Sequence, residues 1–296
     1  MRPDKPSNTA LMVAAGLQLV PPHPATDPHL PTEAITRGAA LLQAADPRFA
    51  AMLRKPWFRR LCHSLEHATL AGISLHFALR KRTLRNHAHT AVAAGCTQVV
   101  VLGAGLDTLC MELHAAWPDL RCIEIDHPAS QAVKQRAAGP DGEGITFIGA
   151  DLAQQALSQV LSANPVFAPD APTLFVAEGL LMYVPLAGVA ELFRQMAKAT
   201  PGCSVAFTWL EPQADGKPNF KRPSRVVDLY LKLRGEPLLS SCLRSALPGF
   251  LAEVGFALDG IHDSVELLSA GQRAALGPDG LPIAGEYIAF AHALRA

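Results

Sequence analysis

The sequence predicts an α/β protein with a mostly parallel sheet and helices on both of its faces. Three observations support this prediction. A run of four apolar residues, 99–102, fits a strand buried on both faces and leads directly into a glycine turn. From residue 98 onward, strand-like and helix-like patterns alternate. An acidic residue follows the second, third and fourth predicted strands, at the edge where open α/β sheets bind ligands.

The parallel part of the predicted sheet alternates strands with helices. The strands are expected at 98–102, 121–125, 145–148, 173–177 and 204–209. The helices between them are expected at 108–116, 129–137, 152–162 and 186–199. Two late strands, 256–262 and 286–293, are expected to complete a seven-stranded sheet as an antiparallel pair at one edge.

The residues before the first strand predict a helical cover. Apolar residues recur at three- and four-residue spacing over 8–19, 32–45, 48–62 and 65–94, interrupted by proline-rich segments at the start and at 21–28. We therefore expect an N-terminal cover with a cofactor-closing helix over 1–94. The core is expected over 95–296, with an acceptor-site insertion around 210–250.

Composition excludes several classes of protein. The chain has 296 residues, 49% of them hydrophobic, and no net charge, which favours one large core and disfavours nucleic acid as a partner. Its six cysteines form no C-x-x-C pair, and the apolar segment 10–20 is too short to span a bilayer. The histidines lack a ligand set for a metal. We expect a cytoplasmic protein with no metal and no membrane partner, either a monomer or a homodimer.

The glycine turn indicates the kind of ligand. Gly103 and Gly105 let the backbone turn tightly and approach a ligand, and Asp126 at the tip of the next strand can accept both ribose hydroxyl hydrogens. A dinucleotide site would carry a third glycine where this chain has Thr108. This pattern favours an adenosine cofactor without a pyrophosphate, of which S-adenosylmethionine is the commonest. The alternative is a turn that uses glycine for geometry alone.

The acidic residues that follow the strands form a predicted set. Asp126, Asp151 and Glu178 could meet the ribose, the adenine amino group and the cationic centre of the ligand. Asp151 alone is also a good N-cap for a helix that starts at Leu152.

Several motifs together carry a resemblance to a known family. They are Ser7-Asn-Thr-Ala-Leu11, Leu79-Arg-Lys-Arg82, Val101-Leu-Gly-Ala-Gly-Leu-Asp-Thr108, Ile123-Glu-Ile-Asp-His-Pro128, Gly149-Ala-Asp-Leu152, Val176-Ala-Glu-Gly-Leu-Leu-Met-Tyr-Val184 and Gly235-Glu-Pro-Leu238. With them the chain resembles the leucine carboxyl methyltransferase family, a class I S-adenosylmethionine-dependent group with a Rossmann-like fold. Many bacterial members carry an arginine where this chain has Leu109, so the resemblance does not identify the substrate.

The resemblance also implies roles for individual residues. By matching positions it implies cofactor contacts from Arg80 or Arg82 and from Gly103, Ala104, Gly105, Asp107, Glu124, Asp126, Asp151, Leu152 and Glu178. Arg80 would pair with the methionine carboxylate, because a planar guanidinium can bind a carboxylate with two hydrogen bonds. Arg82 is the competing candidate.

The expected reaction needs no catalytic dyad. A sulfonium methyl is already activated, and a carboxylate acceptor is ionised at neutral pH, so the rate would come mostly from alignment. We predict an O-methyltransferase that acts on the carboxylate of a small molecule, with Tyr183, Arg222 and Arg225 as acceptor-site candidates. For a hydroxyl acceptor, His127 or Tyr183 could assist as a base.

Other functions remain open from the sequence. The alternatives are a hydroxyl O-methyltransferase of a natural product, a cofactor-binding protein without turnover, a methyltransferase of a protein tail, and a nicotinamide-dependent dehydrogenase. Thr108 opposes the last of these.

Overall fold

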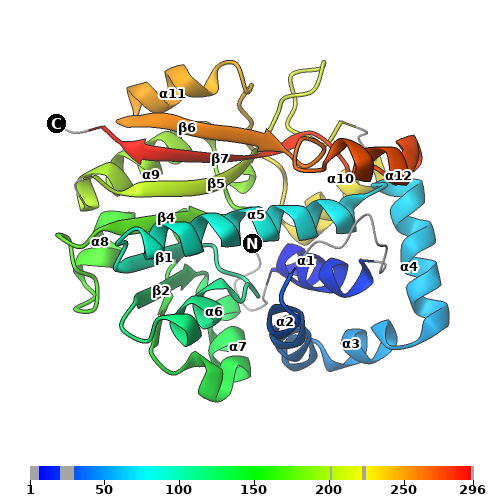
Figure 1. The fold of residues 1–296 in the computed structure, drawn as a ribbon, viewed down its shortest axis with the longest axis horizontal. Coiled ribbons are helices and arrows are strands. Elements are labelled where there is room, and N and C mark those ends of the chain that lie inside the picture. Colours follow the sequence, from blue (N-terminus) through cyan, green and yellow to red (C-terminus); the bar gives the residue numbers. More distant parts are fainter. Residues whose placement is uncertain (1–6, 21–29, 201, 222–224, 295–296) are drawn as a thin grey trace.

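The computed structural model describes residues 7–20, 30–200, 202–221 and 225–294, which form the predicted seven-stranded α/β sheet (Figure 1). The strands are β1 (Gln98–Leu102), β2 (Arg121–Asp126), β3 (Ile145–Gly149), β4 (Thr173–Ala177), β5 (Ser204–Leu210), β6 (Phe256–Asp263) and β7 (Glu286–Ala293). Their order in the sheet is β3-β2-β1-β4-β5-β7-β6. β1 to β5 pair in parallel, and β7 runs antiparallel to both of its neighbours. The predicted antiparallel pair therefore lies at one edge, with β7 rather than β6 next to β5.

Helices precede, connect and follow the strands. Those before β1 are α1 (Asn8–Leu19), α2 (Thr32–Ala45), α3 (Pro47–Leu53), α4 (Pro56–Thr69) and α5 (Ile73–Ala93). The later helices are α6 (Leu109–Ala116), α7 (Pro128–Ala138), α8 (Leu157–Ser162), α9 (Leu186–Ala199), α10 (Arg225–Arg234), α11 (Leu247–Glu253) and α12 (Ala270–Gly280). Figure 1 shows α5 running across the sheet, with α1 to α4 grouped beside it. The division of the chain into 1–94 and 95–296 stays a prediction.

Alternate side chains of β1 enter two separate cores. Val99 and Val101 pack with residues of α1, α2 and α5, whereas Val100 and Leu102 pack with residues of α8, α9 and α11. All four side chains are almost completely buried. Helices on both faces exclude water from the strand, which explains its continuous apolar sequence.

Two of the four predicted N-terminal helices, 8–19 and 32–45, agree with α1 and α2, and the other two are divided in the structure. The predicted helix 48–62 is divided between α3 and α4, because Pro56 disfavours a helical conformation in the residue before it; Lys55 is extended (φ −83°, ψ 125°). The predicted helix 65–94 is interrupted at Gly72 (φ 79°), where an added Cβ would overlap the Leu281 carbonyl oxygen. Only glycine combines this left-handed backbone with such a close chain crossing.

The prediction that Asp151 caps a helix starting at Leu152 is wrong, since α8 begins at Leu157. One carboxylate oxygen of Asp151 accepts a hydrogen bond from the backbone N–H of Ala153 (3.0 Å), and the other accepts one from the side-chain amide of Gln154 (2.9 Å). These bonds stabilise a turn, which competes locally with helix. Asp151 therefore stays at the edge of the sheet.

No helix in the described ranges is both long enough and apolar enough to cross a bilayer.

Candidate functional site

A cavity of about 1080 Å³ lies at the carboxyl ends of the central strands and continues under the N-terminal helices. β1 and β4 are neighbours in the sheet although β2 and β3 come between them in sequence, so the strand order reverses here. Open α/β sheets bind ligands at such a switch point. The residues predicted for the site that line this cavity are Arg80, Gly103, Ala104, Gly105, Asp107, Asp126, Asp151, Leu152, Glu178 and Tyr183.

The glycine turn after β1 needs both of its glycines. Gly103 (φ 67°) and Gly105 (φ 48°) have left-handed backbones, which a side chain would strain. A Cβ added at Gly105 would lie 2.9 Å from the Cβ of Ala10, at the start of α1. The first turn of α1 therefore packs directly on the glycine turn, and the two form one wall of the cavity.

Asp126 lies at the tip of β2 with its carboxylate held by the backbone. One oxygen accepts a hydrogen bond from the N–H of Gly105 (2.5 Å), and the other accepts one from the N–H of His127 (2.6 Å). Burial raises the pKa of this carboxyl, while the two amides act in the opposite direction. Each oxygen keeps a further lone pair, so the group can still accept hydrogen bonds from a ligand's hydroxyls.

Arg80 is buried between two glutamates. Its Nε donates to Glu178 (2.8 Å), and its Nη1 donates to both oxygens of Glu286 (3.0 and 2.9 Å). The Nη2 atom of Arg80 lies beside the backbone at Gly179. The described residues supply no hydrogen-bond acceptor for this atom. The two carboxylates fix the plane of the guanidinium and leave the Nη2 edge for a ligand.

Lys81 extends this network to the glycine turn. Its Nζ lies 2.8 Å from Asp107 and 2.8 Å from Glu178. Although burial alone would raise the pKa of the Asp107 carboxyl, the ammonium of Lys81 holds it below its usual value. Lys81 belongs to the basic run at 79–82 but is not among the residues that the sequence predicts for the site.

The edge of the cavity at the strand ends, which we call the charged rim, formally carries an excess of negative charge. Its carboxylates belong to Asp107, Asp126, Asp151 and Glu178, and its cations belong to Arg80 and Lys81. Four acidic against two basic side chains leave two negative charges uncompensated. Such a rim suits a ligand with cationic groups and disfavours one with several anionic groups.

Glu286, at the start of β7, connects Arg80 to a buried histidine. His76 Nε2 lies 2.7 Å from the carboxylate of Glu286, and its Nδ1 lies 2.6 Å from the hydroxyl of Ser264. Burial opposes ionisation of Glu286, but the charges of Arg80 and His76 outweigh it and lower the pKa to about 2. The sequence does not predict His76 or Glu286 as site residues, because nothing in their spacing shows that β7 lies beside α5.

Glu236 connects the N-terminal helix α1 to the segment that follows α10. It accepts hydrogen bonds from the backbone N–H groups of Asn8 (3.0 Å) and Thr9 (3.1 Å) and from the Thr9 hydroxyl. The first amides of a helix have no partner within the helix, so a carboxylate there stabilises it. Glu236 and Thr9 both line the cavity. The motifs around residues 7–11 and 235–238 thus meet in space, which the sequence did not reveal.

Glu236→Ala is expected to lower the free energy of unfolding by about 1–3 kcal/mol, because it leaves the amides of Asn8 and Thr9 without an acceptor. It should also weaken binding of the cofactor, because α1 forms a wall of its site. Urea denaturation and calorimetry would measure both effects. The matched control is Glu253→Ala, at an exposed position. Equal behaviour of the two variants would contradict the role assigned to Glu236.

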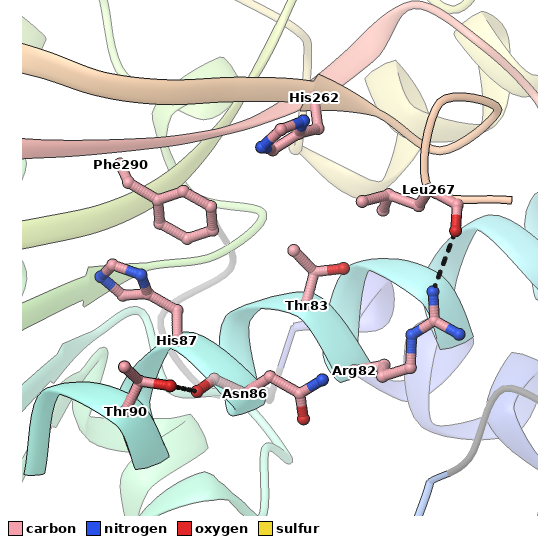
Figure 2. A pocket seen from close by; sticks show the side chains of 8 residues that line it. All are labelled: Arg82, Thr83, Asn86, His87, Thr90, His262, Leu267 and Phe290. Carbon is pink, nitrogen blue, oxygen red and sulfur yellow. Dashed lines mark hydrogen bonds between the residues drawn. The ribbon is translucent and has the colours of Figure 1, made fainter. Parts of the chain in front are cut away.

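Arg82 points away from this site, into a second cavity of about 560 Å³ between α5 and the β6–β7 edge. Figure 2 shows its guanidinium directed at the Leu267 carbonyl oxygen, to which it donates a hydrogen bond of 3.3 Å. His87 stacks on Phe290 in the same cavity, with ring centroids 4.0 Å apart. The sequence leaves Arg80 and Arg82 as alternative partners of the methionine carboxylate. In the structure, Arg80 is the one that lies at the strand ends.

Three further predicted residues are not among the described residues that line the cavity. Glu124 is completely buried outside the cavity lining, with Lys134 Nζ 2.6 Å from its carboxylate, and this ion pair fastens α7 to β2. Arg222 lies outside the described residues, and Arg225 is the first residue of α10, whose Val227 and Leu231 line the cavity.

Comparison with known proteins identifies the family. The model of the leucine carboxyl methyltransferase family matches residues 36–197, more than half of the chain. The chain belongs to the leucine carboxyl methyltransferase family. Within this family, it is 30% identical over 220 residues to a candidate S-adenosylmethionine-dependent methyltransferase of Mycobacteroides abscessus, with 68% of each chain covered. A second such protein from the same organism is 29% identical over 209 residues, covering 66% of this chain and 65% of the relative.

The chain thus spans about two thirds of the length of these curated relatives. These relatives confirm the predicted cofactor, S-adenosylmethionine. A solved structure, a DUF574 family protein from Streptomyces avermitilis, has a similar fold, with a TM-score of 0.59 and 17% identity; 80% of this chain and 90% of that chain are covered.

The site of this family member fits that cofactor. The glycine turn offers a surface without side chains, Asp126 offers acceptors for ribose hydroxyls, and the Nη2 edge of Arg80 suits the methionine carboxylate. The charged rim suits the sulfonium and ammonium groups. Individual contacts to the cofactor stay predictions.

Proposed function

We propose that the protein transfers the methyl group of S-adenosylmethionine to the carboxylate oxygen of a small-molecule acid. The observation that carries this proposal is that the acidic and basic groups nearest the glycine turn are already engaged. Glu178 is paired with Arg80 and Lys81, and Glu236 holds the start of α1. A site whose described residues offer no free base suits an acceptor that arrives ionised.

The two bases considered for a hydroxyl acceptor are poorly suited to that task. Burial raises the pKa of Tyr183 to about 12, so its phenol stays protonated at neutral pH. His127 Nδ1 accepts a hydrogen bond from the backbone N–H of Ala129 (3.3 Å), which places the ring hydrogen of a neutral imidazole on Nε2. Neither group then offers a free basic atom.

The acceptor carboxylate needs a counter-charge on entry. In the described part of the lining, the cations belong to Arg80, Lys81 and Arg85, and each is paired with carboxylates. We therefore retain Arg222 and Arg225 as the proposed counter-charges. Arg225 begins α10, the helix that carries Val227 and Leu231 to the cavity, and Arg222 precedes that helix in the sequence.

The chain contributes positioning and exclusion of water. The bound cofactor supplies an activated methyl group. Asp126 would hold its ribose and Arg80 its methionine carboxylate, the start of α1 covers the glycine turn, and the proposed arginines orient the acceptor. Alignment of this kind can contribute about 7–11 kcal/mol to lowering the barrier.

The experiment compares octanoic acid, octanol and octylamine as acceptors, each incubated with methyl-labelled S-adenosylmethionine. We expect label only in the methyl ester, which releases labelled methanol in alkali. Turnover should change little from pH 6 to pH 9, because the acid is ionised throughout and no base must be deprotonated. Methylation of octanol with a rate that rises with pH would instead establish a hydroxyl acceptor. Methylation of octylamine would also overturn the proposal.

A further inference from the structure

The cavity continues beyond the charged rim into an apolar part beneath the N-terminal helices, which we call the cover chamber. Its described wall comes from α1, α2, α3, α4 and α5, with Leu30 and Leu70 next to these helices. The large apolar side chains in it include Val13, Leu17, Ile35, Phe49, Leu65 and Phe77. Among the described lining residues between 10 and 77, the sole charged side chain is Glu66, which accepts hydrogen bonds from the N–H and hydroxyl of Ser74.

The cover chamber and the charged rim share a wall. Ala10 packs on Gly105 at the rim, while Val13 and Leu17 of the same helix line the chamber. A ligand that passes along α1 therefore moves from charged to apolar surroundings within a few helical turns. The two parts of the cavity suit the two reactants: the charged rim suits the cofactor, and the cover chamber suits the apolar body of an acceptor.

Apolar side chains also reach the surface from the chamber wall. Met12 and Leu65 line the cavity, yet 50% and 55% of their surfaces are exposed. Exposed apolar surface that continues into a cavity is typical of a binding site for an apolar group.

We propose that the acceptor is a monocarboxylic acid with an extended apolar body that occupies the cover chamber. This inference rests on the proposed function for the identity of the reacting group. Burial of the body in the chamber supplies affinity without charge, and the carboxylate stays at the rim end. The negative rim opposes an acceptor with further anionic groups, so a dicarboxylic or phosphorylated acid fits the cavity poorly.

The test measures binding of straight-chain acids from butanoate to dodecanoate by calorimetry, with S-adenosylhomocysteine present to prevent turnover. We expect Kd to fall about fourfold for each added methylene, equivalent to about 0.8 kcal/mol, until the chamber is filled. A Kd independent of chain length, or no binding by any of the acids, would overturn the inference.

Two variants on α2 locate the binding. Ile35→Trp fills the chamber and should weaken decanoate binding at least tenfold, whereas Ala40→Trp adds the same side chain at an exposed position outside the lining and should not. Thermal unfolding would show that both variants fold. Equal decanoate affinity in the two would refute the chamber as the binding site.

The same acids separate this inference from the proposed function. Tight binding of long acids without methyl ester formation would reject the function and leave the chamber in place. Methylation of short and long acids with equal KM would keep the function and reject the chamber.

Discussion

Arg80→Ala is expected to lower the free energy of unfolding by about 3–5 kcal/mol, because it leaves the buried carboxylates of Glu178 and Glu286 without their shared cation. It should also remove measurable S-adenosylmethionine binding, since the proposed partner of the methionine carboxylate is lost. Urea denaturation measures the first effect, and calorimetry on the folded variant measures the second.

Arg82→Ala is the matched control on the same helix. Its side chain lines the second cavity, so cofactor affinity should stay within about twofold of the parent value. Arg80→Lys separates the effect of charge from that of geometry. Lysine retains the buried charge, but it cannot donate to two glutamates and a ligand in one plane. Cofactor affinity lost in Arg82→Ala and kept in Arg80→Ala would reverse the assignment.

Asp126→Ala is expected to weaken S-adenosylmethionine binding by about 1.5–3 kcal/mol, roughly tenfold to 150-fold, the range for a hydrogen bond to a charged group. The carboxylate already orders the glycine turn through Gly105, so part of the loss comes from that turn. Calorimetry with the cofactor would measure the change.

Two comparisons make this result specific. Asp126→Asn keeps an acceptor oxygen and should lose less affinity than the alanine variant. Asp119→Ala removes an exposed carboxylate near the other end of β2 and should change nothing. Unchanged cofactor affinity in Asp126→Ala would reject the ribose role.

Much of the fold followed from local patterns. The apolar run at 99–102 predicted a strand buried on both faces, and the alternation after residue 98 predicted the parallel sheet. The errors arose where a single residue overrode the periodicity. Pro56 and Gly72 divide helices that the apolar spacing joined, and the turn made by Asp151 delays α8 to Leu157.

The site could be predicted only in part. The glycine turn and Asp126 are adjacent to their strands, so their position at the sheet edge followed from the order of elements. The choice between Arg80 and Arg82 required the direction of each side chain on α5. Glu236 and Glu286 required contacts between segments more than 200 residues apart.

By itself, the sequence determined the α/β class, the glycine turn and the acidic strand ends, because these depend on residue type and short spacing. Tertiary structure alone decided that β7 lies between β5 and β6, that Glu178 and Glu286 share Arg80, and that α1 closes over the turn. The physical reason is that a buried charge is tolerable only beside its partner. That partner is supplied by whichever distant segment the packing of the whole chain brings next to it.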